Sequence, residues 1–242
     1  MQKIKINRGT FKGKIYFFSD FHENHQKYFL LQPRNFIEKD DRKDAHDKFP
    51  EASKRQTKWF FDHWNNTITE EDIVFNLGDT CFGDPTGERF DTISKLPCKH
   101  HYVLNGNHMS GHKSCYEQAK REFLGPNAKC NPHQEIYPLS YNNVTFLGDV
   151  AHLSFGRDLF VLSHFPFKIW DKMGKGVSHL SGHSHGNDKD RLVDSQTGKT
   201  LDVGIEVAQS FNNSPFFSLE EIVSIMGNKE QVLHDHHDQK TT

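Results

Sequence analysis

Five short apolar runs in this sequence each end in side chains that can bind a divalent metal, and this pattern constrains the fold more than any other feature. The runs are Lys14–Ser19, Ile73–Leu77, His101–Leu104, Leu159–Ser163 and Val177–Ser181. Runs of this length, rich in β-branched and aromatic residues and bounded by Gly, Asn or Asp, are typical of buried strands. In α/β sheets the carboxyl ends of several strands converge, and ligand sites gather there. The sequence therefore predicts an α/β fold with a ligand site at its strand ends.

The side chains after these runs carry the donor atoms that divalent metals prefer. Carboxylate and amide oxygens suit hard cations, and neutral imidazole also suits borderline metals. Two of the runs lead into ligand pairs spaced i and i+2, which lie on one side of an extended segment. A single Asp-x-His or lone histidine occurs by chance and is more often structural, but five such groups after five strands predict a metal site. The candidate residues are Asp20, His22, Asp79, Asn107, His108, His164, His183 and His185.

Helical periodicity recurs between the predicted strands. Apolar and aromatic side chains at helical spacing predict a helix at Glu51–Asn65, and a second helix is expected at Cys115–Phe123. Ser218 and Glu221 form a capping-box pattern, in which Ser218 accepts from a free backbone N–H while Glu221 reaches back. This pattern predicts a helix over Leu219–Met226.

Three segments look irregular in the sequence. The segment at about residues 32–50 is heavily charged, and it predicts either a mobile flap near the site or a solvated loop without substrate contact. Phe165–Gly176, directly after His164, mixes aromatic residues with lysines and predicts a loop. The polar, His-rich run at 234–242 predicts a solvated tail. Because no repeat or long linker divides the chain, we expect a single domain over residues 1–242.

Composition excludes several classes of protein. With 30 basic and 32 acidic side chains, the formal net charge is −2, whereas a dedicated nucleic-acid or membrane-surface protein needs a basic face. The four cysteines, Cys81, Cys98, Cys115 and Cys130, form no Cys-x-x-Cys pair, which favours reduced thiols over disulfides or a thiolate zinc site. No stretch has the length of a signal-peptide core or a membrane span. We therefore expect a cytoplasmic protein that does not bind membranes.

The order of the five polar blocks resembles the calcineurin-like metallophosphoesterase superfamily. The blocks are Asp20-x-His22, Gly78-Asp79, Gly106-Asn107-His108, His164 and Gly182-His183-x-His185. The flanking sequences resemble a compact bacterial and phage branch of that superfamily. These flanks are the helix ending in Trp64-Asn65, the run Asp72–Asp84, and the segments Leu201–Ile205 and Pro215–Ile222. The resemblance covers most of the chain.

The resemblance implies a four-layer α/β/β/α sandwich with a dinuclear metal site at one edge. Carried over position by position, the first metal takes Asp20, His22, Asp79 and His185, and the second takes Asp79, Asn107, His164 and His183. The Asp79 carboxylate, shared by both metals, lowers the repulsion between two dications, and a hydroxide bridging them becomes available near neutral pH. His108 is implied as a catalytic group over the phosphate, where it donates to an oxygen or protonates the leaving group.

Two positions depart from the pattern of the superfamily. Many members carry an acidic residue directly after the Gly-Asn-His block, where this chain has Met109, so His108 needs another orienting partner, such as a backbone carbonyl or Asp84. Protein Ser/Thr phosphatases have a phosphate-binding arginine shortly after the Gly-Asp block. Here Thr80-Cys81-Phe82 supplies none, which argues against a phosphoprotein phosphatase.

The leading hypothesis is a metal-dependent phosphodiesterase that acts on small, nucleotide-like phosphate esters. Alternatives are a phosphomonoesterase with small substrates and a nuclease for single-stranded nucleic acid, for which Lys168, Lys172 and Lys175 are the nearby basic residues. A non-catalytic scaffold is disfavoured because it has no reason to keep clustered histidines and carboxylates. Mn²⁺ is the first expectation for both metals, because the donor set has no thiolate, and Fe, Zn and Ni stay open. The ligands do not encode the oligomeric state.

Overall fold

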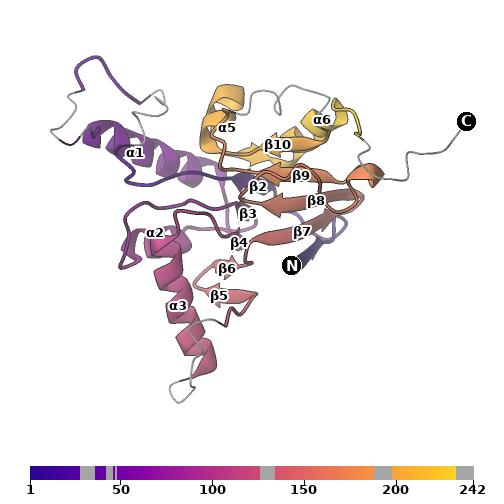
Figure 1. The fold of residues 1–242 in the computed structure, drawn as a ribbon, viewed down its shortest axis with the longest axis horizontal. Coiled ribbons are helices and arrows are strands. Elements are labelled where there is room, and N and C mark those ends of the chain that lie inside the picture. Colours follow the sequence, from indigo (N-terminus) through magenta and orange to yellow (C-terminus); the bar gives the residue numbers. More distant parts are fainter. Residues whose placement is uncertain (28–35, 42–45, 47, 126–133, 188–197, 233–242) are drawn as a thin grey trace, which may run out of the picture.

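The computed structural model describes residues 1–27, 36–41, 46, 48–125, 134–187 and 198–232, and it contains two β-sheets (Figure 1). The five-stranded sheet has the order β1 (Gln2–Ile6), β7 (Val150–Phe155), β8 (Asp158–Ser163), β9 (Ser178–Ser181) and β10 (Thr200–Asp202). The six-stranded sheet has the order β11 (Phe217–Ser218), β2 (Ile15–Phe18), β3 (Ile73–Asn76), β4 (His100–Val103), β6 (Val144–Phe146) and β5 (Leu139–Tyr141). The α/β class is therefore confirmed.

The five apolar runs of the sequence form β2, β3, β4, β8 and β9, each within one residue of the predicted limits. All residues of β2, β3 and β9 are buried, as expected for strands covered on both faces. Strands β2, β3 and β4 are parallel neighbours, and β8 and β9 are a second parallel pair. Their carboxyl ends therefore open toward the same edge within each sheet.

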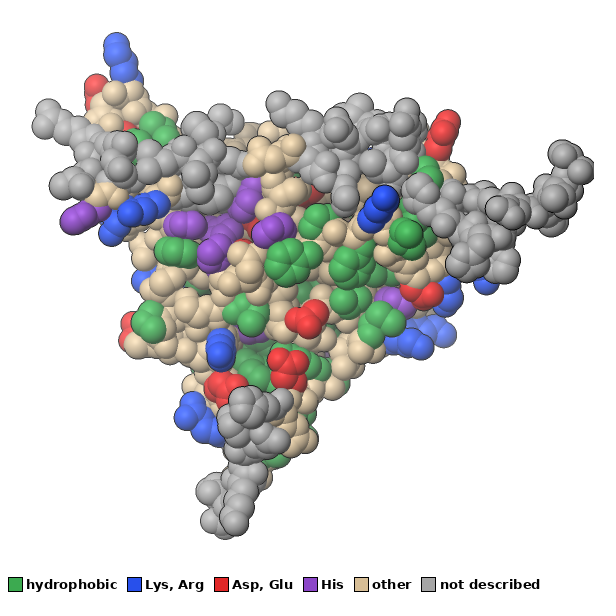
Figure 2. Space-filling model, viewed as in Figure 1, with side chains coloured by type: hydrophobic (Ala, Val, Ile, Leu, Met, Phe, Trp, Pro, Cys, Tyr) green, Lys and Arg blue, Asp and Glu red, His purple; other side chains and the backbone are tan. Residues whose placement is uncertain are grey.

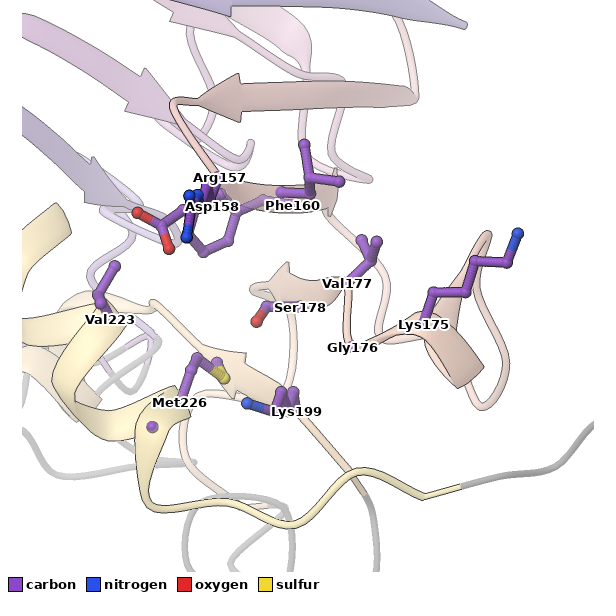
Figure 3. Close-up of a pocket in the computed structure, with 12 residues that line it drawn as sticks. Arg157, Asp158, Phe160, Lys175, Gly176, Val177, Ser178, Lys199, Val223 and Met226 are labelled. Carbon is purple, nitrogen blue, oxygen red and sulfur yellow. The ribbon is translucent and has the colours of Figure 1, made fainter. Parts of the chain in front are cut away.

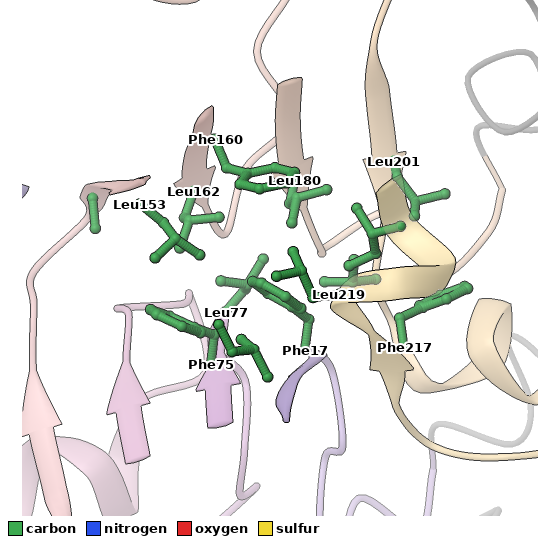
Figure 4. Close-up of a cluster of buried hydrophobic side chains, with 14 of the residues drawn as sticks. Phe17, Phe75, Leu77, Leu153, Phe160, Leu162, Leu180, Leu201, Phe217 and Leu219 are labelled. Atoms are coloured by element: carbon green, nitrogen blue, oxygen red, sulfur yellow. The ribbon is translucent and has the colours of Figure 1, made fainter. Parts of the chain in front are cut away.

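The main core lies between the two sheets (Figure 4). Phe17 and Phe75 of the six-stranded sheet stack with ring centroids 5.2 Å apart, and they face Phe160, Leu162 and Leu180 of the five-stranded sheet. Alternate residues along each strand point into this layer because side chains of a strand alternate between its faces. Four buried phenylalanines, Phe17, Phe75, Phe160 and Phe217, belong to this core between the sheets.

Helices cover the outer face of the six-stranded sheet. They are α1 (Pro50–Thr67), α2 (Glu88–Ser94) and α3 (Ser110–Leu124). Phe60 and Trp64 of α1 are fully buried there, and the Trp64 ring packs edge-on against Phe18 of β2 at 6.2 Å. The predicted helices at Glu51–Asn65 and Cys115–Phe123 are thus confirmed, each within a longer helix.

Two further helices, α5 (Ile205–Asn212) and α6 (Leu219–Gly227), contribute side chains to the core between the sheets. The predicted capping box begins α6, because Ser218 accepts from the backbone N–H of Glu221 and the Glu221 carboxylate accepts from the backbone N–H of Ser218. None of the described helices combines the length and apolar character that a membrane crossing requires.

The outer face of the five-stranded sheet is covered by the segment 165–177. Val161 of β8 packs there against Trp170, Met173 and Val177. The segment is irregular apart from the single turn η2 (Met173–Lys175), in agreement with the predicted aromatic loop. Two facing sheets with helices over one outer face are therefore shown, while a complete four-layer sandwich is not.

The charged insertion is partly described. Phe36 is buried against α1, where its ring lies 5.2 Å from that of Trp59, and Arg55 donates to the Phe36 carbonyl. This part of the insertion buries more than its charge content predicts. Residues 32–35, 42–45 and 47 of the insertion lie outside the described residues, as do the tail 234–242 and Cys130. Cys81, Cys98 and Cys115 are buried free thiols, as expected.

Candidate metal centre

The polar blocks that follow the five strands meet at one place. Asp20 and His22 follow β2, Asp79 follows β3, and the block with Asn107 and His108 follows β4. From the five-stranded sheet, β8 leads to His164, and β9 leads to His183 and His185. Figure 2 shows histidine side chains gathered on one face of the molecule, with hydrophobic side chains directly beside them. The seven predicted ligands lie together there, and their donor atoms fall into two sets that both include Asp79.

The first donor set consists of Asp20, His22, Asp79 and His185. Oδ1 of Asp20 lies 3.8 Å from Nε2 of His22 and 3.6 Å from Nε2 of His185. Oδ2 of Asp79 lies 3.5 Å from the same nitrogen of His22. Asp20, His22 and Asp79 are buried, so these donors converge in a site with little water around it.

The second donor set consists of Asp79, Asn107, His164 and His183. The same oxygen of Asp79, Oδ2, lies 3.4 Å from Nε2 of His164. Oδ1 of Asn107 lies 3.0 Å from that nitrogen and 2.9 Å from Nδ1 of His183. A single carboxylate oxygen therefore belongs to both sets.

These separations of 2.9–3.8 Å are close to those of atoms that bind one metal ion. Two donors bound at about 2.1 Å lie about 3.0 Å apart at a right angle and about 3.4 Å apart at a tetrahedral angle. Donor atoms of Asp20, His22 and His185 also lie within 4.8 Å of one another, as do those of Asp20, Asp79 and His164. The donors are carboxylate, amide and imidazole, without thiolate, and this set suits a borderline divalent ion. The residues present can therefore hold a metal ion.

The backbone of the ligand loops is strained. Left-handed φ angles occur at Asp20 (60°), His22 (48°), Asp79 (52°), His183 (69°) and His185 (50°). For residues with a Cβ this conformation costs roughly 1–2 kcal/mol each, and such strain gathers at functional sites. Hydrogen bonds from the backbone N–H of Asp20 to the Gly78 carbonyl, 3.1 Å, and from that of His22 to the Asp79 carbonyl, 2.9 Å, hold the turns in place.

Two glycines allow the loops to approach closely. A Cβ on Gly106 would lie 2.0 Å from Oδ1 of Asp79, and a Cβ on Gly182 would lie 2.4 Å from Oδ2 of Asp20. Real Cβ atoms do not come that near another atom, so only glycine fits at either position. The glycines of these motif blocks are therefore needed to bring the carboxylates into the site.

Second-layer contacts orient two of the histidines. Nδ1 of His185 lies 2.9 Å from Oε1 of Glu206 in the first turn of α5, and Nδ1 of His164 lies 3.0 Å from the Leu77 carbonyl. Each contact engages Nδ1 and leaves Nε2 facing the other donors, as is usual for metal-binding histidines. Glu206 was not foreseen from the sequence, because an acidic residue in a first helical turn is common.

Burial and charge act in opposite directions on the two carboxylates. Asp20 is fully buried, which raises its pKa to about 6, against the lowering effect of His185 and His164. Burial also acts to raise the pKa of Asp79, but the hydrogen bond and charge of His164 and the backbone N–H of His108 lower it below its usual value. Asp79 is therefore an ionised carboxylate even without a metal, as a shared ligand must be.

The imidazole ring of His108 packs among other rings, while its backbone is held by Asp79. Its backbone N–H donates to Oδ1 of Asp79 at 2.7 Å. Its ring centroid lies 5.2 Å from that of His22, 5.3 Å from that of Phe82 and 5.9 Å from that of His25. His25 in turn stacks on Phe82 at 3.7 Å with an interplanar angle of 8°. Within the described part of the chain, the ring nitrogens of His108 make no hydrogen bond, so this aromatic cage orients the imidazole.

Asp84, the acidic residue that the sequence suggested as a partner of His108, accepts a hydrogen bond from helix α2. Its Oδ2 accepts from the backbone N–H of Phe90 at 3.0 Å in the first turn of α2. Arg89 from the same helix pairs with Glu23 at 3.2 Å and donates to the carbonyls of Phe82 at 3.0 Å and Gly83 at 3.2 Å. Arg89 therefore holds the loop that carries Phe82 against Glu23.

A separate cavity of about 210 Å³ lies where strands β8 and β9 of the five-stranded sheet begin (Figure 3). Asp158 and Ser178, the first residues of β8 and β9, line it, whereas the candidate metal ligands follow the last residues of these strands. Lys175 also lines this cavity, and Lys172 pairs with Asp171 at 3.8 Å. Lys172 lines a second cavity with His152 and Phe160, so neither of these two lysines contributes a basic track at the ligand cluster. Lys168, the third lysine considered for such a track, is exposed in the same loop.

Comparison with known proteins gives a fold relationship only. The sequence matches no protein-family model and no curated protein. The structure is similar to a solved protein of unknown function from Aquifex aeolicus, with a TM-score of 0.57 and 15% identity. The match covers 88% of this chain and 100% of that chain. At this identity the likeness concerns the fold.

Proposed function

We propose that the protein hydrolyses phosphate esters with two divalent metal ions that share the carboxylate of Asp79, as a member of the calcineurin-like metallophosphoesterase superfamily with its four-layer sandwich. The observation that carries the proposal is the position of Oδ2 of Asp79. It lies 3.5 Å from Nε2 of His22 and 3.4 Å from Nε2 of His164, which belong to different donor sets. One oxygen between two sets of candidate ligands is an arrangement that suits a pair of ions about 3.5–4 Å apart.

The ions would supply a nucleophilic hydroxide near neutral pH and charge stabilisation for the phosphoryl oxygens. The chain itself binds and orients the reacting groups. Asp79 holds negative charge between the two donor sets, and Glu206 keeps Nε2 of His185 facing the site. His108, placed by Asp79 and the aromatic cage, would donate a proton to the leaving group or a hydrogen bond to a phosphoryl oxygen.

Small phosphodiesters with nucleotide-like groups are the proposed substrates, and Mn²⁺ is the proposed metal. A phosphomonoesterase would use the same ligands, so only the relative turnover of diesters and monoesters separates the two activities. A nuclease is less favoured because Lys172 and Lys175 lie at cavities away from the ligand cluster, which leaves Lys168 alone of the three lysines for a basic track. A non-catalytic scaffold is disfavoured by the strained backbone at five ligands, which costs stability without a metal to bind.

The test compares wild-type protein with Asp79→Asn after Mn²⁺ loading. We expect about two ions per wild-type chain by elemental analysis and turnover of bis-p-nitrophenyl phosphate, with p-nitrophenyl phosphate and cyclic nucleotides as comparison substrates. Asp79→Asn removes the charge shared by both ions, so metal content and turnover should fall together. Full metal content and a near-normal rate in Asp79→Asn would refute the shared role of this carboxylate.

A further inference from the structure

Phe165 is an exposed aromatic residue directly beside the second donor set. Its side chain is 48% exposed, although it follows the buried ligand His164 in the chain. The Phe165 ring centroid lies 4.6 Å from that of His183 and 5.1 Å from that of His164. A large apolar ring is thus presented to solvent directly beside two of the candidate ligands, at the place where a substrate would bind.

Packing of the loop does not explain the exposure of Phe165. The same segment sends Phe167 and Trp170 inward, where both stack on the buried ring of His179 at 5.1 Å and 5.3 Å. Trp170 also donates from Nε1 to the Val177 carbonyl at 2.8 Å. The loop therefore covers the sheet with its other aromatic residues and leaves Phe165 at the metal centre.

Hydrogen bonds fix the backbone on which Phe165 is carried. The hydroxyl of Ser163 donates to the Phe165 carbonyl at 2.6 Å, and Oγ of Ser163 lies 2.9 Å from Nε2 of His179. Nδ1 of His179 lies 3.2 Å from the hydroxyl of Thr200 on β10. These contacts tie the turn after β8 to two neighbouring strands. A ring on a fixed backbone loses little freedom when a ligand stacks on it, so the surface is preorganised.

The site has two aromatic sides, and they face different donor sets. His108 and Phe82 lie with His22 of the first set, whereas Phe165 lies with His164 and His183 of the second set. A leaving group protonated by His108 lies on the first side. The ester group that stays on the phosphorus is then the one that can reach Phe165.

We propose that Phe165 is the stacking platform for a planar ring in the retained ester group, such as a nucleobase, and that it makes the site selective for diesters carrying such a ring. This inference rests on the proposed hydrolase function. Stacking of a base on an aromatic side chain is sequence-tolerant and changes affinity by roughly 10- to 100-fold. Because the retained group is stacked before and during the reaction, Phe165 should act on KM and leave kcat unchanged.

The test uses the Mn²⁺-loaded protein and two substrates that share one leaving group, thymidine 5′-(p-nitrophenyl phosphate) and ethyl p-nitrophenyl phosphate. Phe165→Leu keeps an apolar side chain but removes the planar ring. We expect it to raise KM for the thymidine ester roughly 10- to 100-fold without changing kcat. KM and kcat for the ethyl ester should not change. Phe165→Trp should keep the low KM, because a larger ring stacks as well. Ile169→Ala, which alters a 61% exposed residue of the same loop, is the matched control and should change nothing.

Other outcomes overturn the inference. Equal losses on both esters, or loss of metal from Phe165→Leu, would mean that Phe165 only shields the ligand histidines. If the wild type hydrolyses neither ester, the proposed function fails, and calorimetric titration with thymidine 5′-monophosphate still decides the stacking. Binding weakened roughly 10- to 100-fold by Phe165→Leu would uphold the platform, and equal binding by both proteins would refute it.

Discussion

The metal-free fold is more stable with Asp20 protonated, whereas metal binding requires Asp20 to be ionised. The carboxyl group is fully buried, and burial raises its pKa from 3.8 to about 6. A carboxyl whose pKa is higher in the folded than in the unfolded state favours folding only while it is protonated. The metal-free fold therefore loses stability as the pH rises from 3.8 through about 6. A bound dication reverses this effect because it favours the ionised form.

Asp20→Asn should accordingly stabilise the metal-free protein at pH 7.5. The amide keeps an oxygen for the backbone N–H of His183, which now bonds to Oδ2 at 2.9 Å, and it never ionises. We expect a gain on the order of 1–3 kcal/mol in urea unfolding with a chelator present, which disappears near pH 4. Asp158→Asn, at a partly exposed carboxylate 3.8 Å from Arg8, is the control and should give no such pH-dependent gain. Identical curves for Asp20→Asn and wild type would contradict the reasoning.

His108 should separate catalysis from metal binding. It lies outside both donor sets, and only its backbone N–H contacts Asp79. His108→Ala should therefore keep the metal content of the wild type, yet lose roughly 10²–10⁴ in rate, the usual range for a positioned general acid. The loss should be smaller for p-nitrophenolate than for an alkoxide leaving group, which needs protonation.

Other results of this substitution assign His108 differently. A loss equal for good and poor leaving groups would indicate stabilisation of a phosphoryl oxygen. Loss of metal would make His108 a ligand, and an unchanged rate would reduce it to a structural residue of the turn after β4. Elemental analysis of the same protein sample distinguishes these cases.

At the scale of elements, the sequence predicted the strands that carry the ligands better than the rest of the sheets. Runs such as Ile73–Leu77 are apolar except for Asn76, so their burial can be predicted without knowing which strands they pair with. β1 was missed, although Lys3 and Lys5 alternate with Ile4 and Ile6 as in a half-buried strand, because its pairing with β7 joins residues nearly 150 positions apart.

The positions of the candidate donor residues at the strand ends were predictable for the same local reason, whereas the residues around them were not. Each ligand follows a recognisable strand, so its place at the strand end can be read from the sequence. Glu206, His25 and Phe82 reach the site only through the approach of loops from different elements. Arg89 supports Phe82 from the next helix, and nothing in its neighbourhood in the sequence distinguishes it from a solvated arginine.

The turn between β4 and α3 gives a prediction at this scale. A Cβ on Gly106 would meet Oδ1 of Asp79 at 2.0 Å and the backbone nitrogen of Asp79 at 2.6 Å. Gly106→Ala must therefore push the turn away from Asp79, which separates Asn107 from the shared carboxylate. We expect metal affinity to fall by roughly 10- to 100-fold, comparable to the loss of an outer-shell partner.

Gly227→Ala is the matched control for this change. A Cβ on Gly227, at the end of α6, would meet no atom within 4 Å. It should leave metal affinity unchanged, as measured by titration with Mn²⁺ under identical conditions. Equal affinities of Gly106→Ala and wild type would show that the turn can shift without cost to the site.

At the scale of the whole molecule, the ligand cluster joins the two sheets. Asp20, His22, Asp79 and Asn107 follow strands of the six-stranded sheet, whereas the other three ligands follow β8 and β9 of the five-stranded sheet. Direct links between the loops exist without metal, since the backbone N–H of His183 donates to Asp20 across the interface. A metal bound by both groups of ligands would add a cross-link at the edge of the main core.

Metal binding should therefore stabilise both sheets together. At a free-metal concentration about 100 times Kd, each bound ion contributes about 2.7 kcal/mol, which raises Tm by roughly 5–10 °C per ion for a chain of this size. Hydrogen exchange locates the effect. We expect slower exchange on Mn²⁺ addition in 19–25, 78–84, 104–109, 163–166 and 181–187, because opening any one of these loops must release the metal. Helix α6, which carries no ligand, is the internal reference for local protection. Slower exchange confined to the loops of one sheet would mean that the ions are held by that sheet alone, and Asp79→Asn should abolish the protection in both.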